Sequence, residues 1–189
     1  LAAVSQGFGV PLSVAIEGLA KFQGVRRRQD LLFALDGVRV YDDFAHHPTA
    51  VAETIAAIRA KHAEGTLWAV FEPRSATACR ALHQAEYERA FTGAGRVILA
   101  PVGRPDIAES ERLDVGKITS ALRAAGTHAE NAASVEAIVT SIATEAQPGD
   151  TVLLLSNGAF GGIYDKIRDA LTQRAASADR SGAAKVEAR

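Results

Sequence analysis

The sequence contains 189 residues, of which 48% are hydrophobic and 23% are charged, and its formal net charge is −1. This length suits one packed α/β domain rather than two complete domains, and the balanced charge excludes the basic field that nucleic-acid binding needs. A single cysteine, Cys79, cannot form an internal disulfide, and no apolar stretch reaches the roughly 18 residues of a membrane-spanning helix. We therefore expect a cytoplasmic protein with neither a nucleic-acid nor a membrane partner. Because the chain contains no Met, we also expect it to be a piece of a longer polypeptide.

The first predicted elements are a short helix and a β-hairpin. A helix is predicted between Pro11 and Gly24, because apolar residues recur on one side of this segment. The segments LLFAL and VRVYDDF then flank Asp36 and Gly37, a pair that favours a tight two-residue turn. The pattern therefore predicts an antiparallel hairpin near the N-terminus.

Helices and strands alternate through the rest of the chain. After Pro48 we expect a helix, then the strand TLWAVFE, a helix over residues 76–91 and the strand RVILAPV. Helices are expected over residues 114–125 and from Ser134, followed by the strand TVLLLS and a helix over residues 162–173. This order predicts an α/β fold with a mostly parallel sheet and helices on both faces. Residues 175–189 lack a periodic apolar face and are predicted to form a disordered tail.

Polar residues gather where three of the predicted strands end, in the segments DDFAHHP, EPRSAT and SNGAFGG. Such residues often do no more than cap helices and form turns. However, the carboxyl ends of parallel strands meet at one edge of a sheet, where ligands collect. Three polar clusters at one edge therefore favour a ligand site. Its candidate residues are Asp43, His46, His47, Arg74, Ser156 and Asn157.

The same loops give little support to a metal site or to a complete nucleotide site. Adjacent histidines usually point in different directions, and the remaining histidines show no HxxxH or HExxH spacing, so we predict no metal site. The sequence has no GxxxxGK[ST] loop, since the segment LDVGKIT imitates only its Gly-Lys pair. GAFGG can still form an anion cradle, because a Gly-rich turn lets backbone N–H groups approach a phosphate or a carboxylate. The chain can therefore hold part of a nucleotide but not grip its triphosphate.

The motifs RRRQD, YDDFAHHPTA, EPRSAT and LSNGAFGGI occur in this order, and together they resemble the C-terminal domain of a Mur ligase. The resemblance covers about residues 24–171 and implies a Rossmann-like fold. It places the C-terminal domain at residues 25–174, with the end of a central ATP-binding domain in residues 1–24 and the tail in residues 175–189. Within the family, EPRS and SNGxFGG favour the members that attach a tripeptide over those that attach alanine.

The resemblance implies an ATP-dependent ligase of peptidoglycan recycling that joins UDP-N-acetylmuramate to the tripeptide L-Ala-γ-D-Glu-meso-diaminopimelate. The muramoyl carboxylate would be phosphorylated by ATP, and the amino group of the peptide would attack the acyl phosphate. ATP and Mg²⁺ would be bound mainly by the central domain, which carries the P-loop in this family. We therefore expect this chain to be inactive by itself and to need the N-terminal and central domains as partners.

The resemblance also implies a role for each candidate residue. Arg28 matches the arginine that reaches the ATP phosphates, and Arg27 is the alternative within the same motif. Arg74 suits the carboxylates of an acidic peptide, because Arg pairs with carboxylates in bidentate geometry. The implied ATP-binding residues are Arg28, Asp43 and His46, and the implied substrate-binding residues are His47, Arg74, Ser156 and Asn157. The resemblance leaves open which of the two histidines meets the nucleotide and which meets the substrate.

Three other functions remain open at this point. The protein could be a UDP-N-acetylmuramate:L-alanine ligase, which shares the DDFAHHP motif. It could be a metal-dependent phosphoesterase in which the DDFAHH cluster is catalytic by itself. It could also be a non-catalytic module that binds a nucleotide or a peptide without any other domain.

Overall fold

The centre of the fold is a six-stranded sheet with the strand order β1-β2-β6-β3-β4-β5. The computed structural model describes residues 2–22, 24–104 and 106–187. The strands are β1 (Asp30–Leu35), β2 (Val38–Asp43), β3 (Leu67–Phe71), β4 (Arg96–Leu99), β5 (His128–Asn131) and β6 (Thr151–Leu155). β1 pairs antiparallel with β2, and every other pair of neighbours is parallel. The expected mostly parallel sheet with an N-terminal hairpin is therefore confirmed.

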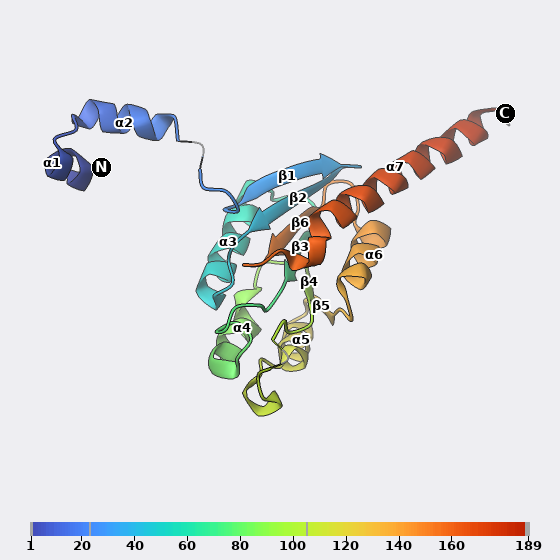
Figure 1. Ribbon diagram of the computed structural model, residues 1–189. Coiled ribbons are helices and arrows are strands. Elements are labelled where there is room, and N and C mark those ends of the chain that lie inside the picture. The colour runs from blue at the N-terminus through green and yellow to red at the C-terminus, as the bar shows by residue number, and fades with distance from the viewer. Residues whose placement is uncertain (1, 23, 105, 188–189) are drawn as a thin grey trace.

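Helices cover both faces of this sheet (Figure 1). One face packs against α3, α4 and α5, and the opposite face packs against α6 and α7. The helices are α1 (Ala2–Phe8), α2 (Leu12–Ala20), α3 (Pro48–Lys61), α4 (Gln84–Ala90), α5 (Val115–Ala124), α6 (Val135–Glu145) and α7 (Ile163–Glu187), with short 3₁₀ turns η1 (Ala81–His83), η2 (Glu109–Glu111) and η3 (Phe160–Gly162).

Alternate residues of the central strands divide the core into two layers. In β6, Leu153 and Leu155 belong to the layer under α3–α5, whereas Val152 and Leu154 belong to the layer under α6 and α7. Both faces of a parallel sheet are covered, so its central strands are apolar throughout. The sequences LWAVF of β3 and TVLLL of β6 follow this rule and are buried at every position. This double burial holds the strand ends in fixed relative positions, and with them the loops that follow.

The hairpin turn has the geometry that its sequence predicts. Asp36 and Gly37 both adopt positive φ angles, of 50° and 73°, as a type I′ turn requires. A Cβ atom on Gly37 would also lie 2.7 Å from Cβ of Pro148. Glycine is therefore needed at this position both for its backbone freedom and for its lack of a side chain.

The predicted helix over residues 76–91 is correct only in its second half. α4 begins after η1, residues 76–79 form turns, and Arg80 forms an isolated β-bridge with Arg112. The Ser75 hydroxyl accepts a hydrogen bond from the Ala78 N–H at 2.9 Å, and such local bonds of serine compete with helix formation. Cys79 therefore lies in a buried turn and not on a helix.

Two other elements differ from the sequence-based expectation. The sequence does not predict β5, because HAEN contains no apolar run, and this strand lies at the edge of the sheet beside β4. α7 continues to Glu187, whereas a disordered tail is predicted from residue 175. The tail is rich in alanine, the strongest helix former, so it extends an existing helix without needing an apolar face.

The first two helices lie apart from the sheet (Figure 1). No residue of α2 is buried. The large apolar side chains of this region are exposed, namely those of Phe8, Leu12, Val14, Ile16, Leu19 and Phe22. The predicted helix after Pro11 therefore forms with its apolar residues open to solvent. In the part of the chain that the structure describes, no helix combines the length and apolarity needed to cross a membrane.

Candidate functional site

The carboxyl ends of the five parallel strands meet at one edge of the sheet. The chain passes from β2 and β3 to the face covered by α3 and α4, but from β6 to the opposite face, where α7 lies. Loops that separate to opposite faces leave crevices on both sides of β6, and open α/β sheets bind ligands at such positions. DDFAHHP contains the last two residues of β2 and the loop after it, and EPRSAT and SNGAFGG follow β3 and β6 respectively. The predicted convergence of the three polar clusters at this edge is therefore confirmed.

Arg27 ties the segment before β1 to two of these strand ends. Its Nε donates to Asp42 Oδ2 at 2.8 Å, and its Nη2 donates to the carbonyls of Ser156 at 2.7 Å and Gly158 at 3.0 Å. Burial alone would lower the pKa of Arg27, but the hydrogen bond and charge of Asp42 outweigh burial and raise it. Arg27 also has a φ of 59°, a conformation that non-glycine residues keep only where the surroundings hold them.

Tyr164, in the first turn of α7, completes this group. Its hydroxyl donates to Asp42 Oδ1 at 3.1 Å and accepts from Arg27 Nη2 at 3.1 Å. Burial, together with the charge of Asp42, raises the pKa of Tyr164 to about 12, so the hydroxyl keeps its proton at neutral pH. Asp42 is only 4% exposed, and both of its carboxylate oxygens accept hydrogen bonds. Asp42 therefore orients Arg27 and Tyr164.

Asp43 joins the loop before β1 to the loop after β2. It is 2% exposed, its Oδ1 accepts from Ala45 N at 2.7 Å, and its Oδ2 accepts from Gln29 N at 2.8 Å. Its backbone carbonyl accepts from Ser156 N at 3.1 Å. Each carboxylate oxygen is therefore already bonded, and a nucleotide would have to share an oxygen with a backbone N–H.

His46 and His47 follow this loop and lead into α3. The His46 ring is partly buried, with Nδ1 at 3.0 Å from the Phe44 carbonyl. The tautomer that donates from Nδ1 leaves Nε2 as a free acceptor. His47 is exposed, and its ring centroid lies 4.7 Å from that of His83. The two adjacent histidines therefore have different neighbours, as separate roles would require.

Arg28 is exposed, whereas the adjacent Arg27 is partly buried. The Arg28 guanidinium lies 5.8 Å from the centre of the Phe44 ring. Among the described residues, no carboxylate forms an ion pair with Arg28. Contact with an aromatic face leaves the guanidinium charged and most of its donors open. Arg28 is therefore available to an incoming anion.

Arg74 lies on the loop after β3, opposite the loop after β6. Its side chain is 51% exposed, with Nη1 at 3.6 Å from Glu72 Oε1. Ser156 is fully buried and donates from its hydroxyl to the other Glu72 oxygen, Oε2, at 2.5 Å. Asn157 is partly exposed, and its Oδ1 is a buried acceptor without a partner among the described residues. Of these predicted substrate residues, Arg74 is the exposed cation and Ser156 faces the interior.

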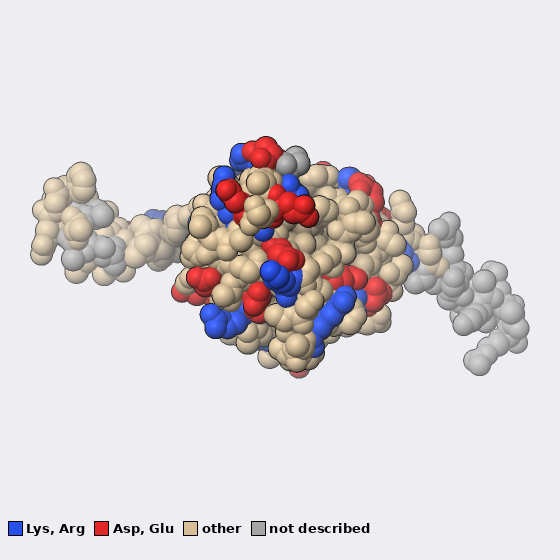
Figure 2. All heavy atoms as spheres, turned by 90° about the horizontal axis from the view of Figure 1, so that it is seen from below, with Lys and Arg blue, Asp and Glu red and all other residues tan. Residues whose placement is uncertain are grey.

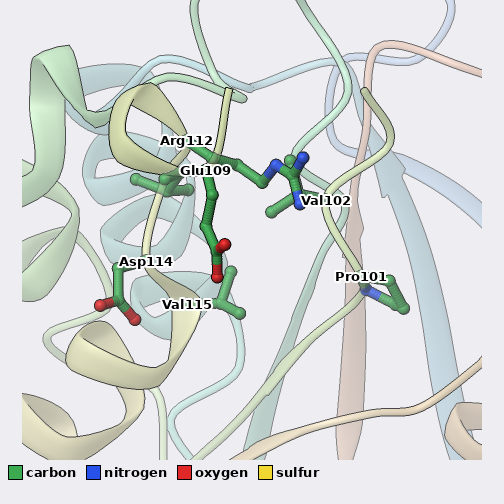
Figure 3. Close-up of a pocket in the computed structure, with 7 residues that line it drawn as sticks. Pro101, Val102, Glu109, Arg112, Asp114 and Val115 are labelled. Carbon is green, nitrogen blue, oxygen red and sulfur yellow. The ribbon is translucent and has the colours of Figure 1, made fainter. Parts of the chain in front are cut away.

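A cavity of about 440 Å³ opens at the end of β4. Figure 3 shows Pro101 and Val102 on one side and Glu109 and Val115 on the other, with the Arg112 guanidinium directed toward Val102. The sequence does not predict this cavity, because the segment ESERLD carries no strand-end motif. Acidic and basic side chains are interspersed over the face shown in Figure 2, and neither sign forms a continuous field there.

Within residues 2–22, 24–104 and 106–187, no three His, Cys, Asp or Glu side chains lie together as a set of metal ligands. Asp42 and Asp43, the last two residues of β2, use all their carboxylate oxygens in the hydrogen bonds described above. Mg²⁺ needs open carboxylate or phosphate oxygens. Asp42 and Asp43 therefore fit Mg²⁺ poorly.

Three residues with contacts at this edge, Glu72, Gly158 and Tyr164, are not predicted from the sequence. Glu72 and Ser156 are 84 positions apart, and they meet only because β6 is inserted between β2 and β3. No local pattern shows such a contact. Tyr164 belongs to a segment that has an ordinary helical pattern, so the sequence carries no signal for its bond to Asp42.

Comparison with known proteins agrees with this architecture. Residues 27–158 match the family described as Mur ligase, glutamate ligase domain. The chain is 35% identical over 179 residues to the UDP-N-acetylmuramate–L-alanyl-γ-D-glutamyl-meso-2,6-diaminoheptandioate ligase of Escherichia coli (strain K12), a match that covers 93% of this chain and 37% of the relative. It is 38% identical over 152 residues to the UDP-N-acetylmuramate–L-alanine ligase of Saccharopolyspora erythraea, covering 79% of this chain and 30% of that relative.

A solved structure also shows similarity to a Mur ligase. The crystal structure of a murein peptide ligase from Psychrobacter arcticus 273-4 superposes with a TM-score of 0.71 and 31% identity, covering 89% of this chain and 35% of that one. The chain thus spans between 30% and 37% of the length of these relatives. The family match begins at Arg27 and ends at Gly158, two residues that are hydrogen-bonded to each other at the sheet edge. The match covers more than half of the chain, and the chain therefore belongs to the Mur ligase family.

Proposed function

We propose that the protein containing this chain joins UDP-N-acetylmuramate to the tripeptide L-Ala-γ-D-Glu-meso-diaminopimelate, with consumption of ATP, in peptidoglycan recycling. This chain supplies the domain that contacts the nucleotide and binds the peptide. The named activity of the Escherichia coli relative supports the proposal, since 93% of this chain matches it. The other two thirds of such a ligase would contain the sites for the UDP-sugar and the ATP triphosphate.

The observation that carries the proposal is the position of Arg74. This half-exposed cation lies in the crevice between β3 and β6, opposite the loop that carries Asn157, whose buried Oδ1 has no partner among the described residues. The tripeptide carries several carboxylates and one amino group. A guanidinium binds a carboxylate through two parallel hydrogen bonds, and an amide oxygen accepts from an N–H group. Arg74 and Asn157 together therefore suit an acidic peptide better than a neutral amino acid.

The chemistry follows from the poor reactivity of a carboxylate. The muramoyl carboxylate attacks the γ-phosphorus of ATP and releases ADP, which gives an acyl phosphate with a good leaving group. The amino group of L-Ala then attacks the acyl carbon, and inorganic phosphate leaves. Arg28, exposed next to Phe44, would stabilise the negative charge on the transferred phosphoryl group. His46, with Nε2 open, would lie on the nucleotide side, and the exposed His47 on the side of the amino substrate.

We assign neither the binding of the ATP triphosphate nor the binding of Mg²⁺ to this chain. Its 189 residues contain no GxxxxGK[ST] loop, and every carboxylate oxygen of Asp42 and Asp43 at the end of β2 accepts a hydrogen bond. We therefore expect this chain to hydrolyse no ATP and to ligate no peptide when it is purified alone with Mg²⁺.

Alanine addition is the second candidate function. The alanine ligase of Saccharopolyspora erythraea is 38% identical to this chain over 152 residues, as similar as the tripeptide ligase of Escherichia coli. Free L-alanine has one carboxylate, whereas the tripeptide extends beyond its first residue toward the loops after β3 and β4. The two candidates therefore differ in whether Arg74 contacts the amino substrate.

A substrate competition with the full-length protein tests the proposal. The enzyme is given UDP-N-acetylmuramate, ATP and Mg²⁺ with the tripeptide or with L-alanine, and the ligated product is measured by mass spectrometry and ADP by a coupled assay. We expect a tripeptide product and a kcat/KM for L-alanine at least about 100-fold lower, a difference of roughly 2.7 kcal/mol in transition-state binding. Ligation of L-alanine alone would identify the alanine-adding enzyme.

The remaining alternatives give different results in the same assays. A metal-dependent phosphoesterase would release phosphate from a phosphoester with this chain alone, and a chelator would abolish the release. A binding module would retain a nucleotide or peptide with no turnover in the full-length protein. Either result would contradict the proposed ligase.

A further inference from the structure

Arg74 and three residues near it, Glu72, Ser156 and Gly158, form a closed ring of contacts between two strand ends. The Gly158 N–H donates to the Ser156 hydroxyl at 2.9 Å, and this hydroxyl donates to Glu72 Oε2 at 2.5 Å. The other Glu72 oxygen, Oε1, lies 3.6 Å from Arg74 Nη1. The Ser156 hydroxyl thus holds one oxygen of the Glu72 carboxyl, and the other oxygen faces Arg74.

Gly158 closes the ring from the opposite side. A Cβ atom on Gly158 would lie 2.2 Å from Arg74 Cδ and 2.4 Å from Arg74 Nε, distances at which one of the two groups must move. The φ angle of Gly158 is not positive, so an alanine there would suffer no backbone strain. A side chain at this position would therefore collide with the side chain of Arg74, while the local backbone would accept it.

The Gly158 loop is held in place and cannot easily retreat. Arg27 Nη2 donates to both the Ser156 and the Gly158 carbonyls. Glu72, at the start of the other loop, donates its own N–H to the Leu155 carbonyl at 3.0 Å. The half-exposed Arg74 side chain is the mobile partner in this contact. A methyl group on Gly158 would thus displace Arg74.

We propose that Gly158, Ser156 and Glu72 are positioning residues that set the direction of the Arg74 guanidinium and thereby the affinity for a carboxylate of the peptide. The inference rests on the proposed function, in which Arg74 binds the peptide. Ser156 is fully buried and Glu72 is 8% exposed, so both act through Arg74 and not by touching the substrate. A guanidinium binds a carboxylate in a fixed planar geometry, and a small displacement loses one of its two hydrogen bonds.

A double-mutant cycle in the full-length ligase tests this inference. Gly158→Ala is expected to raise the KM for the tripeptide about tenfold, with the KM values for ATP and UDP-N-acetylmuramate unchanged within about twofold. In an Arg74→Ala background the same substitution is expected to change the peptide KM by less than about twofold, because the group that it displaces is gone. If Gly158 had a purely structural role, Gly158→Ala would instead change the peptide KM by the same factor in the wild-type and Arg74→Ala backgrounds.

Two further variants separate positioning from folding. Ser156→Ala introduces no collision and removes the bond to Glu72, so a rise of about threefold in the peptide KM is expected. Ala124→Ser, at an exposed position at the C-terminal end of α5 and away from the carboxyl ends of the strands, is the control and should change nothing. If Gly158→Ala lowers the melting temperature, adding Arg74→Ala should restore it, since the collision is then removed.

The outcomes separate the inference from the proposed function. An unchanged peptide KM in Gly158→Ala, with a raised one in Arg74→Ala, overturns the positioning role and leaves the proposed function intact. Equal effects of Gly158→Ala in both backgrounds, or an effect on the KM for ATP, also overturn it. A wild-type enzyme that ligates no tripeptide, or an Arg74→Ala variant with normal peptide KM, overturns the peptide-binding function and the inference together.

Discussion

Arg27 Nε donates a 2.8 Å hydrogen bond to Asp42 Oδ2, while the next residue, Arg28, keeps its guanidinium in solvent beside Phe44. Two adjacent arginines of one motif thus have different surroundings. Arg27 is bound to the carbonyls after β6 and to Tyr164, so its donors are used inside the protein. Arg28 has its donors open. The pair therefore separates a stabilising arginine from one that is free to meet a ligand.

Arg27→Ala is expected to destabilise the fold. The substitution leaves the Asp42 carboxylate buried without its cation and releases the loop after β6, which should cost about 3 kcal/mol. For a protein of this size such a loss lowers the melting temperature by roughly 6–12 °C, as thermal denaturation followed by circular dichroism would show. Arg28→Ala, the adjacent control, should stay within about 0.5 kcal/mol of the wild type. Equal melting temperatures for both variants would contradict the assignment.

Arg28→Ala should instead impair the reaction while the fold stays intact. An arginine that meets the charge of a transferred phosphoryl group contributes about 10³-fold or more to the rate, so the kcat for ligation should fall by at least about 100-fold. Steady-state ligation by the full-length enzyme at saturating ATP measures this change. Near-normal turnover in a folded Arg28→Ala variant would move the phosphate role to another residue.

The sequence predicts the sheet more completely than it predicts the site. Apolar runs such as TVLLL and the Asp36–Gly37 turn are local signals, and the structure agrees with them. The three polar clusters also meet where parallel strand ends must meet. The role of each residue in these clusters depends on contacts between residues on different strands, and the sequence does not show these contacts. Ser156 looks like a ligand-binding hydroxyl in the sequence, yet its neighbour in space is Glu72.

The contacts of Asp43, which the family resemblance associates with the nucleotide, are likewise not shown by the sequence. In the structure its two oxygens accept from the Gln29 and Ala45 N–H groups. Asp43→Asn keeps the shape of the side chain but replaces one acceptor oxygen by an amide donor. We expect a loss of about 2–3 kcal/mol in the free energy of unfolding, measured by urea denaturation. A variant with unaltered stability and a much higher KM for ATP would show that nucleotide contact is the main role of Asp43.

The stability of the domain should also depend on pH through His62. Tyr41 Oη lies 2.8 Å from His62 Nε2, and burial, with the charges of Arg39 and Lys61, lowers the pKa of His62. The native state thus binds the proton less readily than the unfolded chain, in which the pKa of His is about 6.5. The stability that neutral His62 contributes is therefore present above about pH 6.5 and is lost as the pH falls toward the lowered pKa of the native state.

This pH dependence can be tested with a matched pair of variants. His62→Gln should show a smaller fall in melting temperature between about pH 7 and pH 5 than the wild type, because the titrating group is absent. His128→Gln, at an exposed position on β5, serves as the control and should keep the wild-type slope. If the melting temperature changed equally with pH in all three proteins, His62 would not be the source of the pH dependence.

Arg74→Ala should weaken peptide binding without affecting the nucleotide. Loss of a charge-assisted bidentate contact costs about 1.5–3 kcal/mol, so the KM for the tripeptide should rise about 10- to 100-fold. The KM for ATP should stay within about twofold, because the loss concerns one substrate only. Arg104→Ala removes another exposed arginine, one paired with Asp106, and is the control for a general loss of positive charge. If Arg74 only balanced the charge of Glu72, its removal would lower the melting temperature and leave the peptide KM unchanged.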